Sequence, residues 1–121
     1  FFIEKKIKTK LIIAISSGAA LAPKFGWFLY CSSKAAFKFL IESYALEDSK
    51  RSFINISPGL IKTKMQNQIC KIDEKKILSV KKFKILNKQN KIPSSDEVAD
   101  NIINIIQKLK KSSGSYIDIR K

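Results

Sequence analysis

The sequence predicts an α/β fold with a parallel sheet, and two observations support this prediction. Strand-like apolar segments alternate along the chain with segments of helical periodicity, an order typical of βαβ units. The first strand segment is apolar without interruption, as expected for a strand buried on both faces. Because the predicted strands are too few for a well-covered sheet and the chain begins with Phe1, we expect residues 1–121 to be the C-terminal half of a larger domain.

The first half of the chain contains a strand, a helix and a second strand. Residues 10–16 (KLIIAIS) are β-branched and apolar and predict the first strand. Residues 32–47 predict a helix, because apolar side chains recur at helical spacing at Phe37, Leu40, Ile41 and Tyr44. Ala36 and Phe39 widen this face, so we expect the helix to pack against both a sheet and another helix. Residues 52–57 (SFINIS) predict the second strand, which the turn SPGL ends.

The second half contains a lysine-rich segment, a helix and a third strand. Residues 62–90 are irregular in pattern, with one helix predicted around residues 75–84. Ser94 and Glu97 have the spacing of a capping box. The helix that follows has an apolar stripe of Val98, Ile102, Ile106 and Leu109 and ends before Gly114. SYIDI, residues 115–119, predicts a strand with Tyr116 and Asp118 on one face.

Composition excludes several classes of site. The chain has no histidine, so a Cys/His zinc site and a serine–histidine–carboxylate triad are excluded within these residues, and we expect no metal. The net charge of +14 is compatible with nucleic-acid binding, but it is spread along the chain and consists almost entirely of lysine. No signal peptide is evident, and the uncharged run from Leu11 to Pro23 is shorter than the ~20 residues of a membrane span. We therefore expect a soluble, cytoplasmic protein with reduced cysteines and no membrane partner.

Tyr30 and Lys34 form the first candidate catalytic pair. Residues at i and i+4 lie on one face of a helix, with Cβ atoms about 5–6 Å apart, so both side chains can reach one ligand. An ammonium group beside a phenol favours the phenolate, so the pair suits proton transfer to or from an alcohol or carbonyl oxygen. The same spacing also occurs by chance in many helices.

Two further motifs belong at the same edge of the predicted sheet. Ser17 follows the first strand within SSG, and SPGLIKTKM follows the second strand. Ligands of open α/β sheets bind outside the carboxyl ends of the strands. Ser17, the Tyr30–Lys34 pair and this turn are therefore expected to meet at one site.

The set ISSGAA, YCSSK and ISPGLIKTKM, taken in this order, resembles the short-chain dehydrogenase/reductase family from Leu11 to the end of the chain. The segments APKFGWFLYCSSKAA, PGLIKTKMQ and SGSYID are most similar to the sepiapterin reductases and the benzil reductase-type members of that family. The resemblance implies a Rossmann-type, doubly wound parallel sheet. It also implies reduction of a ketone or diketone by hydride transfer from NADPH, with NAD as the alternative cofactor.

The resemblance assigns roles residue by residue. It implies that Ser17 hydrogen-bonds the substrate carbonyl, that Tyr30 donates the proton, and that Lys34 activates Tyr30 and holds the nicotinamide ribose. The residues implied to bind the cofactor are Tyr30, Lys34, Pro58, Gly59, Ile61, Thr63, Met65 and Gln66. Those implied to bind the substrate are Ser17, Gly18, Tyr30, Gly59 and Asp118, of which Asp118 has an equally acceptable interpretation as a solvated carboxylate. Trp27 could line the substrate pocket, but a position in the core or at an interface is favoured.

The sequence lacks two motifs of the family pattern. The glycine-rich phosphate loop and the catalytic asparagine belong upstream of Phe1, so these residues alone are not expected to bind a dinucleotide or to be active. The family also implies a homodimer formed through the helix of residues 32–47. Two alternatives stay open: a truncated relative that acts as a non-catalytic dimerisation or binding module, and a basic nucleic-acid-binding protein.

Overall fold

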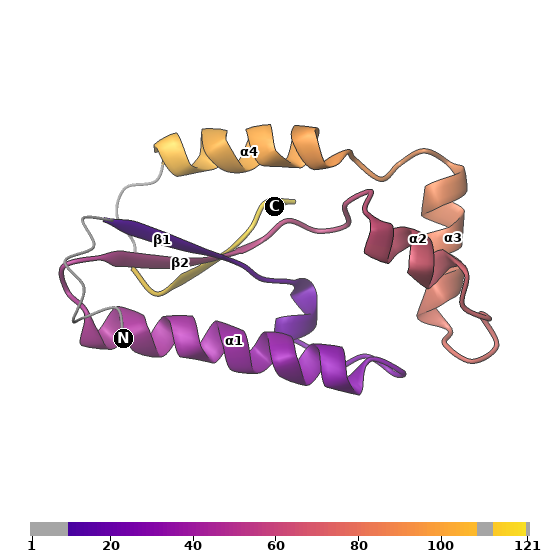
Figure 1. Cartoon of the computed structure of the whole chain (residues 1–121), viewed down its shortest axis with the longest axis horizontal. Helices are drawn as coiled ribbons and strands as arrows, with labels where there is room; N and C mark the ends of the chain where they lie inside the picture. Colours follow the sequence, from indigo (N-terminus) through magenta and orange to yellow (C-terminus); the bar gives the residue numbers. More distant parts are fainter. Residues whose placement is uncertain (1–9, 109–112, 121) are drawn as a thin grey trace.

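The structure, a computed structural model, describes residues 10–108 and 113–120. Within them the elements are β1 (Leu11–Ile15), the 3-10 helix η1 (Gly18–Ala20), α1 (Phe28–Glu47), β2 (Ser52–Ser57), α2 (Lys64–Cys70), α3 (Ser79–Lys88), α4 (Ser95–Lys108) and β3 (Ser115–Asp118). The strands form one parallel sheet in the order β1-β2-β3. Figure 1 shows this sheet between α1 on one face and α4 on the other. The predicted α/β fold with a parallel sheet is confirmed.

The central strand β2 carries the core. Ile54 and Ile56 are almost completely buried because β2 has a strand on either side and helices over its faces. Under α1, Phe53 packs with Ala14 and Ile41. The ring of Tyr44 stacks on that of Phe53, with centroids 5.9 Å apart and planes 12° from parallel. These contacts fix α1 against the sheet, and α1 carries the candidate catalytic pair.

Helix α1 differs from its prediction in length and in buried surface. It begins at Phe28, so Tyr30 lies inside its first turns. Ile41 is buried, but Phe37, Phe39 and Leu40 are exposed. Within residues 10–108 and 113–120 the helix covers the sheet with one face, and its packing against a second helix stays a prediction.

The lysine-rich segment is more ordered than its pattern predicts. It contains two helices, α2 and α3, which pack against each other. Helix α3 begins at Ser79, four residues later than the helix predicted around residues 75–84. The strand at 52–57 and the capping box of α4 are confirmed, and Leu109 lies outside the described residues. The carboxyl ends of the strands point toward the end of the molecule that carries η1, α2 and α3 (Figure 1). In residues 10–108 and 113–120, no helix is long and apolar enough to cross a membrane.

Candidate active site

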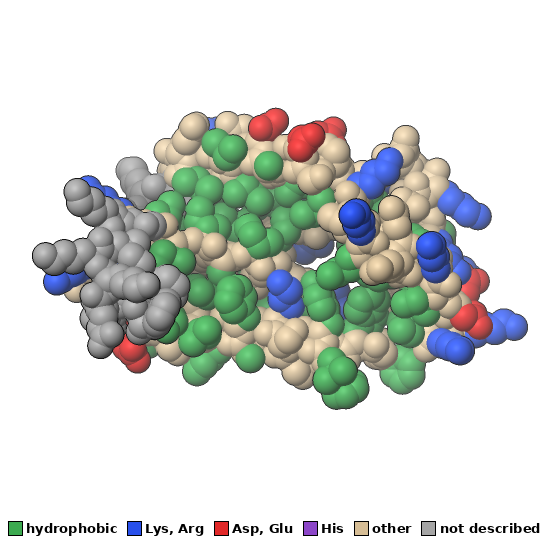
Figure 2. All heavy atoms as spheres, in the orientation of Figure 1, with side chains coloured by type: hydrophobic (Ala, Val, Ile, Leu, Met, Phe, Trp, Pro, Cys, Tyr) green, Lys and Arg blue, Asp and Glu red, His purple; other side chains and the backbone are tan. Residues whose placement is uncertain are grey.

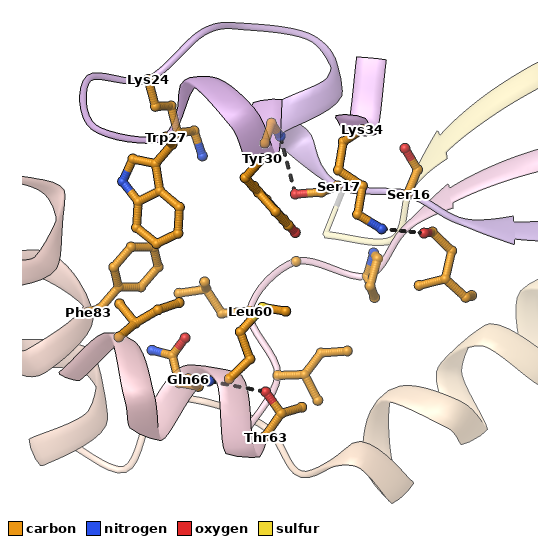
Figure 3. A pocket seen from close by; sticks show the side chains of 17 residues that line it. Ser16, Ser17, Lys24, Trp27, Tyr30, Lys34, Leu60, Thr63, Gln66 and Phe83 are labelled. Atoms are coloured by element: carbon orange, nitrogen blue, oxygen red, sulfur yellow. Dashed lines mark hydrogen bonds between the residues drawn. The ribbon is translucent and has the colours of Figure 1, made fainter. Parts of the chain in front are cut away.

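A pocket of about 380 Å³ lies at the carboxyl ends of β1 and β2. Nine of the predicted site residues line it: Ser17, Tyr30, Lys34, Pro58, Gly59, Ile61, Thr63, Met65 and Gln66. Figure 3 shows Ser17, Tyr30 and Lys34 on one side of the pocket and Leu60, Thr63 and Gln66 on the other. The structure therefore brings together groups that are far apart in the sequence and places them where the strand ends predict a ligand site.

Ser17 is held by the turn that follows β1. Its backbone is extended, and its Oγ accepts a hydrogen bond from the backbone N–H of Ala19 (3.2 Å), which caps η1. A hydroxyl that accepts through a lone pair keeps its own O–H for donation. Ser17 is thus oriented by its cap and can donate a hydrogen bond to an oxygen atom in the pocket.

Lys34 connects α1 to the end of β1. Its Nζ donates to the carbonyl oxygen of Ile15 at 3.1 Å. An ammonium group has three N–H donors, so two remain for other acceptors. Tyr30 precedes Lys34 by about one helical turn, so the two side chains lie on the same face of α1.

The loop after β2 forms the opposite wall. Gly59 adopts a left-handed conformation (φ 77°), which turns the chain at the sheet edge. Thr63 ends this loop as the N-cap of α2, where its Oγ1 accepts from the N–H of Gln66 at 3.3 Å. Thr-x-x-Gln is the spacing of a capping box, so this sequence signal predicts the start of α2, which the irregular pattern alone does not reveal.

An aromatic wall closes one end of the pocket and was not predicted. Trp27 lines the pocket, contrary to the expectation that it lies in the core or at an interface. Its Nε1 donates to Ser79 Oγ at 2.8 Å, and its ring lies 6.0 Å from that of Tyr30 and 5.8 Å from that of Phe83. Ser79 and Phe83 belong to α3, and nothing in their local sequence indicates that this helix folds over the pocket.

Two predicted site residues, Gly18 and Asp118, are not part of the pocket lining. The Asp118 carboxylate is engaged by Arg120 through the Nε–Oδ1 bond (2.8 Å), the Nη2–Oδ2 bond and the bond from the Arg120 backbone N–H (3.1 Å). Hydrogen bonding to Asp118 raises the pKa of Arg120 above its ordinary value. The substrate role of Asp118 stays a prediction, and it would require a ligand to compete with this ion pair.

The charge around the site is positive. Lysines are frequent in and around α2 and α3, and Figure 2 shows several blue and a few red side chains at that end of the molecule. Among residues 10–108 and 113–120, no three Cys, Asp or Glu side chains are grouped so as to hold a metal ion. Two lysines, Lys24 and Lys34, line the pocket itself, together with mostly apolar side chains.

Comparison with known proteins agrees with this geometry. The sequence model of the short chain dehydrogenase family matches residues 4–74. Benzil reductase ((S)-benzoin forming) of Bacillus subtilis is 30% identical over 93% of this chain and 47% of that protein. Sepiapterin reductase of Rattus norvegicus is 28% identical over 91% of this chain and 42% of that protein. The chain thus spans about half the length of these relatives.

Solved structures show the same fold. A short chain dehydrogenase/reductase from Saccharomyces cerevisiae superposes with a TM-score of 0.80 at 23% identity, over 92% of this chain and 46% of that one. The 3-oxoacyl-[acyl-carrier protein] reductase of Brucella melitensis in complex with NAD gives a TM-score of 0.66 at 17% identity, over 95% of this chain and 45% of that one. The chain belongs to the short-chain dehydrogenase/reductase family, and its fold is part of the Rossmann-type sheet of that family.

Proposed function

We propose that the complete protein is an NADP(H)-dependent reductase of a small ketone or diketone, with NAD as the alternative cofactor. The observation that carries this proposal is the convergence of Ser17, Tyr30, Lys34 and the loop of residues 58–63 on one pocket. The similarity to benzil and sepiapterin reductases supports a carbonyl substrate.

The residues fit the nicotinamide half of such a cofactor. Lys34 has N–H donors left for the ribose hydroxyls, and the hydroxyl of Thr63 can still donate to a carboxamide oxygen. The four glycines of the chain do not form a phosphate-binding loop, so the pyrophosphate would be held by residues outside this chain. We therefore propose that residues 1–121 are a partial domain that is inactive alone.

The proposed chemistry assigns one task to each side chain. Ser17 donates a hydrogen bond to the substrate carbonyl oxygen and holds it beside the Tyr30 hydroxyl. The nicotinamide, when bound, supplies the hydride to the carbonyl carbon. Tyr30 transfers its phenolic proton to the oxygen, so that the product is an alcohol, and Lys34 stabilises the resulting phenolate.

The test is Tyr30→Phe in the complete protein, with Tyr44→Phe as the matched control. Both variants lose one phenolic hydroxyl from α1, but Tyr44 stacks on Phe53 in the core and does not line the pocket. Loss of the proton donor is expected to lower kcat by about 10²–10⁴-fold while cofactor binding stays largely intact. A Tyr30→Phe variant that keeps more than about a tenth of the wild-type kcat would contradict the assignment.

The two alternatives make different predictions. A non-catalytic dimerisation or binding module would show no reduction of any carbonyl compound by the complete wild-type protein. A nucleic-acid-binding protein would bind DNA with a steep dependence on salt. For the enzyme we further propose a cytoplasmic location.

A further inference from the structure

The C-terminal end of the described chain places the guanidinium group of Arg120 against the turns that follow β1 and β2, beside the pocket but outside the residues that line it. The side chain of Arg120 covers Gly59, and a Cβ built on Gly59 would lie 2.6 Å from Arg120 Cδ. A Cβ built on Gly18 would lie 3.7 Å from Arg120 Nη2. Gly59 lines the pocket, and Gly18 directly follows Ser17, which also lines it, so Arg120 lies next to two turns that contribute residues to the pocket.

The ion pair with Asp118 orients this guanidinium and leaves donors available. The Nε–H and one Nη2–H are used on the Asp118 carboxylate in a fork-like arrangement. A guanidinium has five N–H donors, so three remain, and they have no partner among residues 10–108 and 113–120. The Arg120 side chain is 58% exposed, whereas that of Asp118 is 12% exposed. The more accessible charge beside the pocket is therefore the cation.

We propose that Arg120 is a specificity-determining residue that binds a second acceptor oxygen of the substrate, adjacent to the carbonyl that is reduced. The substrate class is then a 1,2-dicarbonyl compound rather than an amino-substituted heterocycle, because Asp118 is already neutralised by Arg120. This inference rests on the proposed function, since Ser17 and Tyr30 must hold the reacting carbonyl beside the Gly18 turn.

The test uses a substrate pair that differs in the second oxygen alone. Benzil has two adjacent carbonyl groups, and deoxybenzoin has a methylene in place of one of them. Arg120→Met removes the guanidinium but keeps an unbranched side chain over Gly59. Lys50→Met is the control: it removes one positive charge from an exposed position that precedes the amino end of β2, at the opposite end of the sheet.

In the complete enzyme, Arg120→Met is expected to lower kcat/KM for benzil on the order of tenfold relative to deoxybenzoin. Lys50→Met should leave this ratio unchanged. Equal losses on the two ketones would overturn the proposal, because Arg120 would then only support the Gly59 turn. No loss on either would also overturn it.

Binding provides a readout that does not depend on turnover. Trp27 lies in the pocket wall, so its fluorescence should respond to an aromatic ligand. If Arg120→Met weakens the binding of benzil but not of deoxybenzoin, the specificity role of Arg120 holds. This conclusion would stand even if the wild type reduced neither ketone, because the lack of reduction would contradict the proposed function and not the specificity role. Equal binding of benzil by the wild type and the variant would overturn the specificity role, whatever the activity.

Discussion

Two hydroxyl groups in the pocket accept a hydrogen bond that caps a helix and keep their own O–H available for donation. Ser17 Oγ caps η1 and Thr63 Oγ1 caps α2, and each accepts a backbone N–H in doing so. Because acceptance through a lone pair fixes the side-chain rotamer without using the hydroxyl proton, both donors are oriented before a ligand arrives. Pre-orientation of this kind lowers the cost of binding, since the side chains lose little freedom when the ligand is bound.

At the residue scale, Gly59 combines a positive φ with close contact to another side chain. We predict that Gly59→Ala destabilises the complete protein by about 1–2 kcal/mol through its positive φ alone, with an added cost because the methyl group meets the Arg120 side chain. Gly18→Ala is the matched control, since Gly18 has no positive φ and its nearest contact would be 3.7 Å away. Thermal unfolding of the two variants measures the difference, and equal losses of stability would contradict the prediction.

The sequence predicts the position of the candidate catalytic residues better than it predicts the rest of the pocket lining. The positions of Ser17, Tyr30 and Lys34 follow from the end of a strand and from helical spacing. Both are local sequence patterns, so the meeting of these residues in one pocket could be predicted. Trp27, Ser79 and Phe83 meet only because α3 folds back over the start of α1, and such a contact leaves no local pattern. The Arg120 side chain is equally hidden, because its position over Gly59 depends on how the end of β3 lies against two other turns.

At the element scale, helix ends explain which segments could be predicted. The Ser94–Glu97 capping box is reciprocal in the structure: Glu97 N–H donates to Ser94 Oγ (3.2 Å), and Ser94 N–H donates to Glu97 Oε2 (2.7 Å). An apolar stripe follows it, so α4 is recognisable from sequence. In α2 the cap is present at Thr63 but no stripe follows, and the helix depends on packing against α3.

We predict that Ser94→Ala costs about 0.5–2 kcal/mol of stability, because the Glu97 N–H loses its acceptor. Ser95→Ala removes the same hydroxyl one residue later, inside the first turn of α4, and should change stability by only a few tenths of a kcal/mol. Denaturant unfolding of the complete protein and both variants tests this. Equal effects would show that the hydroxyl of Ser94 does not act as a cap.

The same cap predicts a pH dependence. The backbone and side-chain hydrogen bonds from Ser94 lower the pKa of Glu97 from its ordinary value of 4.5. A lowered folded-state pKa means that the ionised carboxylate stabilises the folded state above pH 4.5, and that this contribution is lost as the pH falls through the folded-state pKa. The stability difference between the wild type and Glu97→Gln should therefore be larger at pH 7 than at pH 3. A difference that does not change with pH would contradict the prediction.

At the scale of the whole molecule, the sheet formed by the described residues has three strands. Among residues 10–108 and 113–120, β1 is an edge strand of a parallel sheet, and parallel sheets are normally extended and covered on both faces. Figure 2 shows hydrophobic side chains across the open side of the sheet between α1 and α4. Since the chain spans about half the length of its relatives, we propose that further strands of the complete polypeptide pair with β1.

The outer face of α1 is a second apolar surface. Phe28, Phe39 and Leu46 are separated by close to whole turns of the helix, so they form one stripe, and their exposed fractions are 73%, 71% and 89%. Ser32 and Ala35 lie between Phe28 and Phe39, and such small side chains allow another helix to approach closely. A stripe of this kind is self-complementary about a two-fold axis, so we propose a homodimer formed through α1, including residues 32–47.

Phe39→Lys should convert this dimer to a monomer. The two-fold symmetry would bury one lysine from each protomer in the interface without a charge partner. Leu78→Lys is the matched control: Leu78 is 78% exposed, comparable with Phe39, but it precedes α3 and lies outside the stripe. Light scattering and sedimentation of the complete protein at micromolar concentrations measure the association. A monomeric wild type, or a Phe39→Lys variant that stays dimeric, would rule out this face of α1 as the interface. Because the stripe begins at Phe28, next to Trp27 and close to Tyr30, loss of the dimer should also loosen the start of α1 and raise KM, an effect that the control variant should not show.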